Sequence, residues 1–167
     1  MLPEQYTGYL ETLNTRLVEQ GFAAFDKEPE GGADRVWHRR KAEITKFSLV
    51  DCFACVRYVP GAELTTDFLA QFSSASFVLA LANKSWLPRG LFGMAIALPL
   101  VITDQVSDDV AAFVRESYCP KHWASQEFPA VLELGTGKLL RFEKTPAWGA
   151  AYYKGMRKGV DALFSPK

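Results

Sequence analysis

The chain has 167 residues, which is enough for one domain with a substantial hydrophobic core and too few for two comfortable ones. Apolar residues make up 49% and charged residues 23%, a globular composition that argues against disorder. Lysine plus arginine and aspartate plus glutamate number 19 each, so the net charge gives no reason to expect a nucleic-acid partner.

Two further features of the sequence concern the compartment. No uninterrupted apolar run approaches the roughly 20 residues of a membrane span. The three cysteines are an odd number, which fits a reducing cytoplasm better than a disulfide framework. We therefore expect a single soluble, cytoplasmic globular domain over residues 1–167, with no membrane partner.

The first half of the chain predicts a helix, a hairpin and a second helix. An apolar stripe between Pro3 and Gln20 predicts an amphipathic helix. Two extended segments, at about 35–44 and 47–59, are expected to pair as an antiparallel hairpin with its turn near Thr45 and Lys46. A helix capped by Thr65 or Thr66 then runs to about residue 83.

The second half is organised around a buried strand. The run Leu98–Asp104 is apolar until it ends abruptly in polar residues, which is typical of a central strand in an α/β sheet, and Pro99 is placed at its first position. A helix over 107–118, an irregular connection over 119–128, a hairpin of strands 129–134 and 138–144 and a closing helix over 146–164 follow.

The predicted order is therefore α-β-β-α-β-α-β-β-α. Strand 99–104, helix 107–118 and strand 130–134 form a βαβ unit, which makes the two strands parallel. The flanking hairpins make the sheet mixed. The fold class expected is α/β, with α+β as the alternative: one mixed sheet of about five strands with helices packed on its faces.

The first candidate site is the carboxyl edge of this βαβ unit, where α/β sheets prefer to bind ligands. The amino terminus of the 107–118 helix would point its free N–H groups there. The competing interpretation is structural, because these residues are also typical of tight turns. The ligand-binding candidates are Asp104, Gln105, Ser107, Thr136 and Lys138.

A second candidate combines Cys52 and Cys55 with Cys119 and His122, which have the ligand types for zinc. Residues three apart on a strand point to opposite faces, so we expect no metal site here. His122 has no serine or cysteine in a recognisable catalytic neighbourhood and is kept as a secondary candidate.

The basic segment 35–46 is the third candidate. Its arginines and lysines around Trp37 could track a nucleic-acid backbone while the ring stacks on a base. A lysine- and arginine-rich strand also protects a sheet edge from aggregation, and the zero net charge favours that interpretation.

The fourth candidate is Asp51, a carboxylate within an apolar strand that needs a partner if it is buried. Arg57 on the same strand, or Arg39 or Arg40 across the hairpin, could supply one. Glu43 and Lys46 nearby also suggest a metal-dependent nuclease, although their spacing matches no template, and a structural ion pair is the favoured interpretation.

No segment amounts to a catalytic or cofactor signature. We expect a module that binds a small ligand or a protein partner, that needs no cofactor, and that forms a homodimer. The alternatives are a metal-dependent hydrolase or nuclease using carboxylates such as Asp104, Asp51 or Glu43, and nucleic-acid binding through the basic strand.

Overall fold

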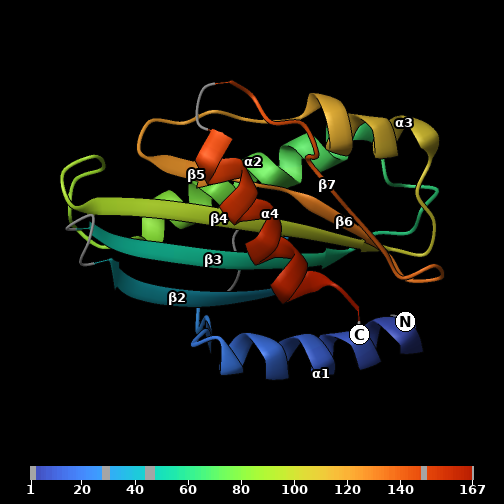
Figure 1. The fold of residues 1–167 in the computed structure, drawn as a ribbon. Coiled ribbons are helices and arrows are strands. Elements are labelled where there is room, and N and C mark those ends of the chain that lie inside the picture. The colour runs from blue at the N-terminus through green and yellow to red at the C-terminus, as the bar shows by residue number, and fades with distance from the viewer. Residues whose placement is uncertain (1–2, 28–30, 44–47, 148–149, 167) are drawn as a thin grey trace.

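The fold is a mixed α/β sheet of seven strands with helices on its faces (Figure 1). The computed structural model describes residues 3–27, 31–43, 48–147 and 150–166. The helices are α1 (Glu4–Glu19), α2 (Thr66–Asn83), α3 (Asp108–Ala112) and α4 (Ala150–Phe164). The strands are β1 (Ala23–Ala24), β2 (Arg35–Glu43), β3 (Ser48–Tyr58), β4 (Gly93–Thr103), β5 (Ser125–Glu127), β6 (Ala130–Glu133) and β7 (Lys138–Arg141).

Strand β4 is the centre of the sheet, as the apolar run predicted. The order is β1-β2-β3-β4-β6-β7, with β5 paired to β4 beside β6. Strands β3, β5 and β6 all run parallel to β4. Two antiparallel pairs flank this parallel core, β2 with β3 and β6 with β7, which confirms both expected hairpins. The turn expected near Thr45 and Lys46 lies outside the described residues.

Pro99 occupies the middle of β4, not its first position, so that prediction was wrong. Residues 95–97 of β4 pair with β5, and residues 100–103 pair with β6. The carbonyls of Ala97 and Thr103 both accept hydrogen bonds from this side of the strand, so the nitrogen of Pro99 faces the same side. Its missing N–H therefore falls at the break between β5 and β6, where a central strand tolerates proline.

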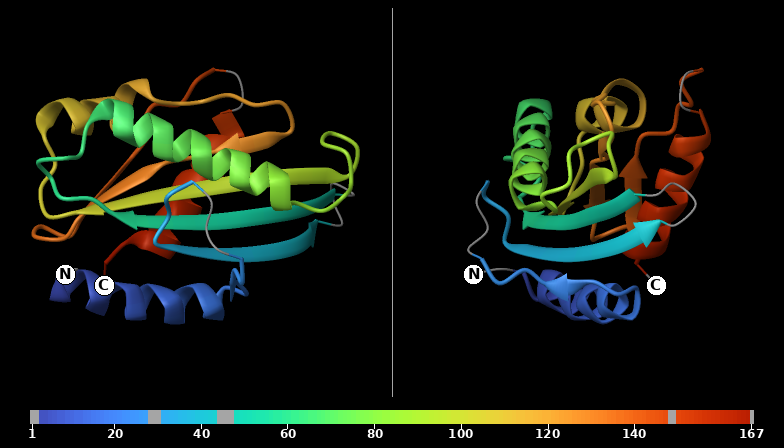
Figure 2. Two further views of the ribbon diagram at one scale, coloured as in Figure 1. Left: turned by 180° about the vertical axis from the view of Figure 1, so that it is seen from behind. Right: turned by 90° about the vertical axis from the view of Figure 1, so that its left-hand side faces the viewer.

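The sheet is buried on both faces because helices cover each of them (Figure 2). Helices α2 and α3 cover the face that carries Phe53 and Cys55 of β3. Helices α1 and α4 cover the face that carries Cys52, Ala54 and Val56. Alternate residues of one strand thus enter two separate cores, which explains why β3 is apolar almost throughout.

Local signals account for the two long helices of the first half. In α1, Tyr6, Tyr9, Leu13 and Leu17 are buried along one stripe, and each leucine contributes about 1.5–3 kcal/mol by leaving water. The side chain of Thr65 accepts a hydrogen bond from the Phe68 N–H, which confirms the expected cap of α2.

Several boundaries in the second half differ from those expected. The helix predicted over 107–118 is the five-residue α3 followed by a π-helical turn over Phe113–Ser117, closed by a bond from the Tyr118 N–H to the Phe113 carbonyl. Ser107 stands at the cap position, but its side chain bonds no helix N–H. The connection expected over 119–128 contains β5. The closing helix was expected to begin at 146, but residues 146 and 147 are not helical and α4 starts at Ala150.

None of the helices in the described ranges is long and apolar enough to cross a bilayer.

Candidate functional site

The ligand-binding candidates at the carboxyl edge of β4 hold loops together. The Gly61 N–H donates to Oδ1 of Asp104 at 2.7 Å, and this bond is the main cause that lowers the pKa of Asp104. The Thr103 hydroxyl donates to the carbonyl of Gln105 at 3.1 Å. Asp104 thereby ties the loop after β3 to the end of β4.

Glu133 does the same for the next loop. Its carboxylate accepts hydrogen bonds from the Thr136 hydroxyl and from the Val106 N–H, which lower its pKa in that order. The Lys138 N–H donates in turn to the Thr136 hydroxyl at 3.3 Å. The predicted edge does come together, but the carboxylates of Asp104 and Glu133 are bonded to loop groups, and neither pocket described below is lined by the residues of this edge. Ligand binding there stays a prediction.

Asp51 lies at the opposite end of the parallel strands. It pairs in register with Ala95, eight residues before Thr103, which is about 26 Å along β4 at about 3.3 Å per residue. Asp51 and Asp104 therefore cannot share a metal ion. Glu43, at the end of β2, lies at the Asp51 end of the sheet, since it pairs with Ser48.

Asp51 is fully buried and holds three donors. His38 Nε2 lies 2.7 Å and Arg40 Nε 2.8 Å from its Oδ1, and the Ser85 N–H donates to Oδ2 at 2.7 Å. Burial by itself raises the pKa of this carboxyl, but the bonds from Ser85, His38 and Arg40 outweigh burial and bring the pKa below its usual value. The expected ion pair is present, with Arg40 as the cation.

The other predicted partners of Asp51 point elsewhere. Arg39 donates to the Gln20 carbonyl and lies over the Phe22 ring, and Arg57 donates to the Gly32 carbonyl. Trp37 is buried, and its indole N–H donates to Asn14 at 2.9 Å, so it cannot stack on a nucleic-acid base as the third candidate required.

A second buried carboxylate, Glu127 of β5, was not predicted. Its Oε1 accepts hydrogen bonds from the hydroxyls of Ser73, at 2.5 Å, and Tyr118, at 3.0 Å. Its Oε2 lies 2.7 Å from His122 Nε2. Burial, followed by the charge of Glu127, raises the pKa of Tyr118 to about 12, so this hydroxyl keeps its proton and donates it.

The orientation of His122 follows from this carboxylate. An ionised carboxylate only accepts hydrogen bonds, so Nε2 of His122 carries the proton and donates it to Glu127. Stacking on Phe77, with ring centroids 3.7 Å apart, fixes the plane of the ring. The His122 side chain is therefore fixed, and its backbone forms an isolated β-bridge with Ser125.

The two histidine–carboxylate pairs lie on the α2 face of the sheet on either side of β4. Asp51 pairs with Ala95 and Glu127 with Ala97 in adjacent rows, and these two alanines leave room beneath α2. The His38 ring stacks on Phe53 at 4.4 Å, as His122 stacks on Phe77. Each histidine is thus fixed by one carboxylate and one phenylalanine.

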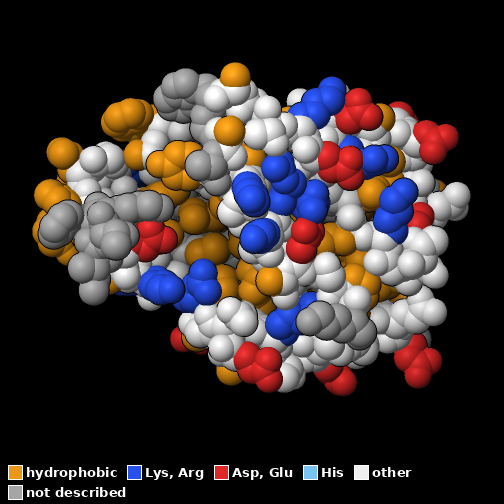
Figure 3. All heavy atoms as spheres, in the orientation of Figure 1, with side chains coloured by type: hydrophobic (Ala, Val, Ile, Leu, Met, Phe, Trp, Pro, Cys, Tyr) orange, Lys and Arg blue, Asp and Glu red, His pale blue; other side chains and the backbone are white. Residues whose placement is uncertain are grey.

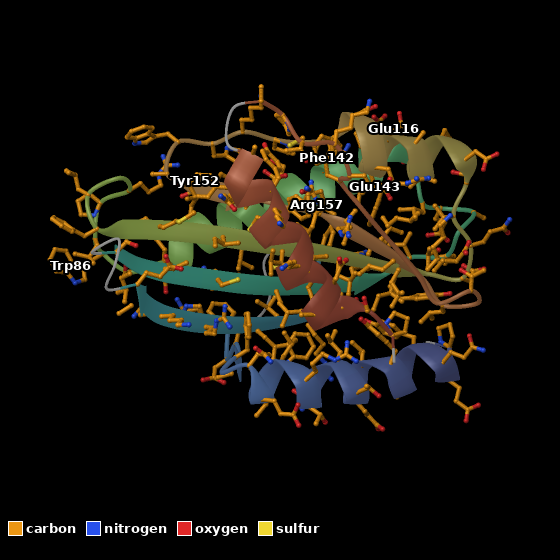
Figure 4. All side chains as sticks on the ribbon, viewed as in Figure 1. Trp86, Glu116, Phe142, Glu143, Tyr152 and Arg157 are labelled. Carbon is orange, nitrogen blue, oxygen red and sulfur yellow. The ribbon has the colours of Figure 1, made fainter. Side chains whose placement is uncertain are left out.

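A pocket of about 450 Å³ opens beside the His122 pair, at the amino end of β4 and β5. Its polar wall includes Lys121, His122 and Gln126, and its apolar wall includes Met94 and Phe128. The first turns of α4 close the far side with Tyr152, Tyr153 and Met156. Figure 4 shows Tyr152 at this end of α4, above the strands. This volume lies in the range of small-molecule sites.

Sequence reasoning found His122 but missed Glu127, Ser73 and Tyr118. The signal for Glu127 was weak because β5 has only three residues, too few to show the period of a strand. Ser73 is one of three serines on α2, with Ser74 and Ser76, and the sequence does not show which of them bonds a carboxylate. The spacing of five residues between His122 and Glu127 was the one hint in the sequence.

The cysteines do not form a common site. Cys52 and Cys55 lie in the two different cores, as the strand geometry predicted. Cys119 donates its S–H to the hydroxyl of Tyr153 at 3.1 Å. Across the described ranges, no three His, Cys, Asp or Glu side chains are arranged to hold a metal ion.

Comparison with protein-family models, curated proteins and solved structures finds no match to this chain.

Proposed function

We propose that the protein is a small-ligand-binding module and that the pocket beside His122 is its site. The observation that carries this proposal is a pocket of about 450 Å³ whose lining joins apolar side chains to the polar residues Lys121, His122 and Gln126. Fixed polar groups in a mostly apolar cavity are what orients a small ligand.

The lining indicates the class of ligand. The apolar side chains of Met94, Phe128 and Met156 suit a hydrophobic or aromatic body. The ammonium of Lys121 and the side-chain amide of Gln126 suit an acidic or hydrogen-bonding group at its end. The carboxylate of Glu127 already has three hydrogen-bond partners, so it is not an unpaired charge that would repel an acidic ligand.

A fluorescent probe with these two properties tests the proposal. Anilinonaphthalene sulfonate has an aromatic body and an anionic group, and we expect one saturable site per chain by calorimetric titration. Met156→Trp fills the cavity and should weaken the affinity about tenfold or more, a loss of about 1.4 kcal/mol. Lys158→Trp, at an exposed position of the same helix, is the matched control.

A charge variant separates this pocket from the carboxyl edge. Lys121→Ala should weaken sulfonate binding, whereas Lys138→Ala, at the opposite end of the sheet, should leave it unchanged. Absence of saturable binding, or equal affinity in Met156→Trp and in wild-type protein, would refute the proposed site. Urea unfolding of each variant shows whether it is folded.

Three other expectations from the sequence stay predictions. Self-association as a homodimer is supported by the frequency of such dimers, and sedimentation velocity tests it. A cytoplasmic location is supported by the odd number of cysteines. The hydrolase and nucleic-acid alternatives gain no supporting contact from the described residues, and assays for nuclease activity and for oligonucleotide binding test them.

A further inference from the structure

Large exposed apolar side chains gather at the amino end of the parallel strands. Of the seven such side chains on the described residues, four come from two loops here and are called the aromatic tip: Trp86 (89% exposed), Leu91 (63%), Phe92 (60%) and Trp123 (75%). Figure 3 shows hydrophobic side chains crowded at the left-hand end of the molecule, where Figure 4 labels Trp86. An exposed patch of this kind marks an interaction surface.

The loop between α2 and β4 imposes this exposure. The N–H groups of Leu91 and Gly93 both donate to the Pro88 carbonyl, which closes a tight turn. Phe92 has a φ of 73°, a left-handed conformation that an aromatic residue rarely adopts, and its carbonyl is held by the Leu49 N–H at 2.7 Å. The side chains are thus displayed by a backbone that is fixed by hydrogen bonds.

The second loop packs on the first. A Cβ atom on Gly90 would lie 3.0 Å from the indole of Trp123, so this ring rests directly against the glycine. Gly90 has a φ of 78°, which also requires glycine. The two loops therefore form one continuous tip around the mouth of the pocket.

The charges around the tip are mainly positive. Lys41, Arg89 and Lys121 are exposed at this end of the molecule. Of the described carboxylates at this end, Asp51 and Glu127 are buried and bonded to their own donors, and Glu43 is half-buried. An exposed surface of tryptophan, leucine and phenylalanine beside lysine and arginine is complementary to the interface of an anionic bilayer.

We propose that the aromatic tip docks this protein on the surface of an anionic lipid bilayer. Its side chains enter the headgroup region while Lys41, Arg89 and Lys121 remain at the lipid phosphates. Surface docking needs no spanning helix, so the expectation of no membrane partner, which came from the absence of a 20-residue apolar run, does not bear on it. A projecting tip of two loops suits a bilayer better than the broad flat area of a stable protein interface.

Vesicle sedimentation tests the proposal on the full chain. We expect binding to vesicles of phosphatidylcholine with 30% phosphatidylserine, weaker binding to phosphatidylcholine alone, and a loss of binding as sodium chloride rises from 50 to 500 mM. The double variant Trp86→Ser with Leu91→Ser should reduce the partition coefficient at least tenfold. Val18→Ser with Val78→Ser, two exposed valines elsewhere, should change it less than twofold.

The charge contribution has its own pair of variants. Lys41→Glu with Arg89→Glu should weaken binding to the anionic vesicles only, and Lys138→Glu at the other end should not. None of Trp86, Leu91, Lys41 or Arg89 lines the pocket, so failure here leaves the small-ligand proposal standing, and the reverse also holds.

Three outcomes would overturn the proposal. The first is no sedimentation with anionic vesicles. The second is sedimentation that the tip variant does not reduce, although its urea midpoint shows it folded. The third is that wild-type protein does not bind vesicles but forms a concentration-dependent dimer or binds a single-stranded oligonucleotide. In that case the tip variant would abolish the dimer or the oligonucleotide binding.

Discussion

Nε2 of His122 lies 2.7 Å from Oε2 of Glu127, whose other oxygen accepts hydrogen bonds from Ser73 and Tyr118. The four side chains come from three segments, so this one carboxylate joins α2, the 118–124 connection and β5. The pocket wall depends on it.

Glu127→Gln keeps the size of the side chain but removes its charge and puts a donor group where an acceptor was. We expect the free energy of unfolding to fall by about 1–3 kcal/mol, because a buried hydrogen-bond partner is left unsatisfied. Urea unfolding measures this. Glu143→Gln, whose pair with Arg115 is exposed, should change stability by less than about 1 kcal/mol. Equal losses in both variants would contradict a special role for Glu127.

Because the pKa of Asp51 is lowered in the folded protein, we expect the free energy of unfolding to depend on pH. The pKa of this carboxyl is lower in the folded protein than the value of about 3.9 expected in the unfolded chain, because Ser85, His38 and Arg40 donate to it despite its burial. Its ionisation therefore stabilises the fold above about pH 4, and this contribution is lost as the pH falls through the folded pKa.

Asp51→Asn removes that contribution. The variant should be less stable than wild type at pH 7 by about 1–3 kcal/mol, and the difference should narrow at pH 3. Urea unfolding of both proteins at the two pH values measures it. A difference that is the same at both would show that the ionisation of Asp51 is not what stabilises the fold.

The thiols should differ in reactivity. Burial raises the pKa of both Cys52 and Cys55 to about 12, so neither forms the reactive thiolate in the native protein. Titration with Ellman's reagent at pH 8 should label at most one thiol per native chain, that of Cys119, and three after unfolding. In Cys119→Ser the native chain should not react. Labelling of two or more native thiols would mean that the sheet opens readily.

Asp104→Ala tests the carboxyl edge. Loss of the bond to the Gly61 N–H should cost about 1 kcal/mol of stability, because it unties the loop after β3. The affinity for anilinonaphthalene sulfonate should stay within twofold of wild type. A large loss of affinity without unfolding would place the ligand site at this edge, as the sequence first suggested.

The sequence was sufficient for the parts of the fold that depend on long periodic patterns. Helix α1, helix α2 and the central position of β4 follow from apolar residues repeated over many positions. The extent of β4 does not, because Pro99 normally argues against a central strand and only the break between β5 and β6 explains it.

The candidate site was harder to predict because its partners are far apart in the chain. Asp51 could be recognised as a carboxylate that needs a cation, and Arg40 was among the partners considered. Glu127, Ser73 and Tyr118 meet only through the packing of α2 on β5, which no local pattern reveals. The residues of the carboxyl edge lie together as expected, but Asp104 and Glu133 accept hydrogen bonds from the neighbouring loops.

The proline in β4 lies at the boundary between two regions of the sheet that differ in strand pairing. On the β5 side only three residues of β4, 95–97, have a partner strand, whereas four residues, 100–103, pair with β6, which β7 covers in turn. Amide protons near β5 should therefore exchange with deuterium faster than those of β6. The walls of the pocket would then belong to the part of the sheet that opens most easily, so a ligand could enter there without unfolding of the rest.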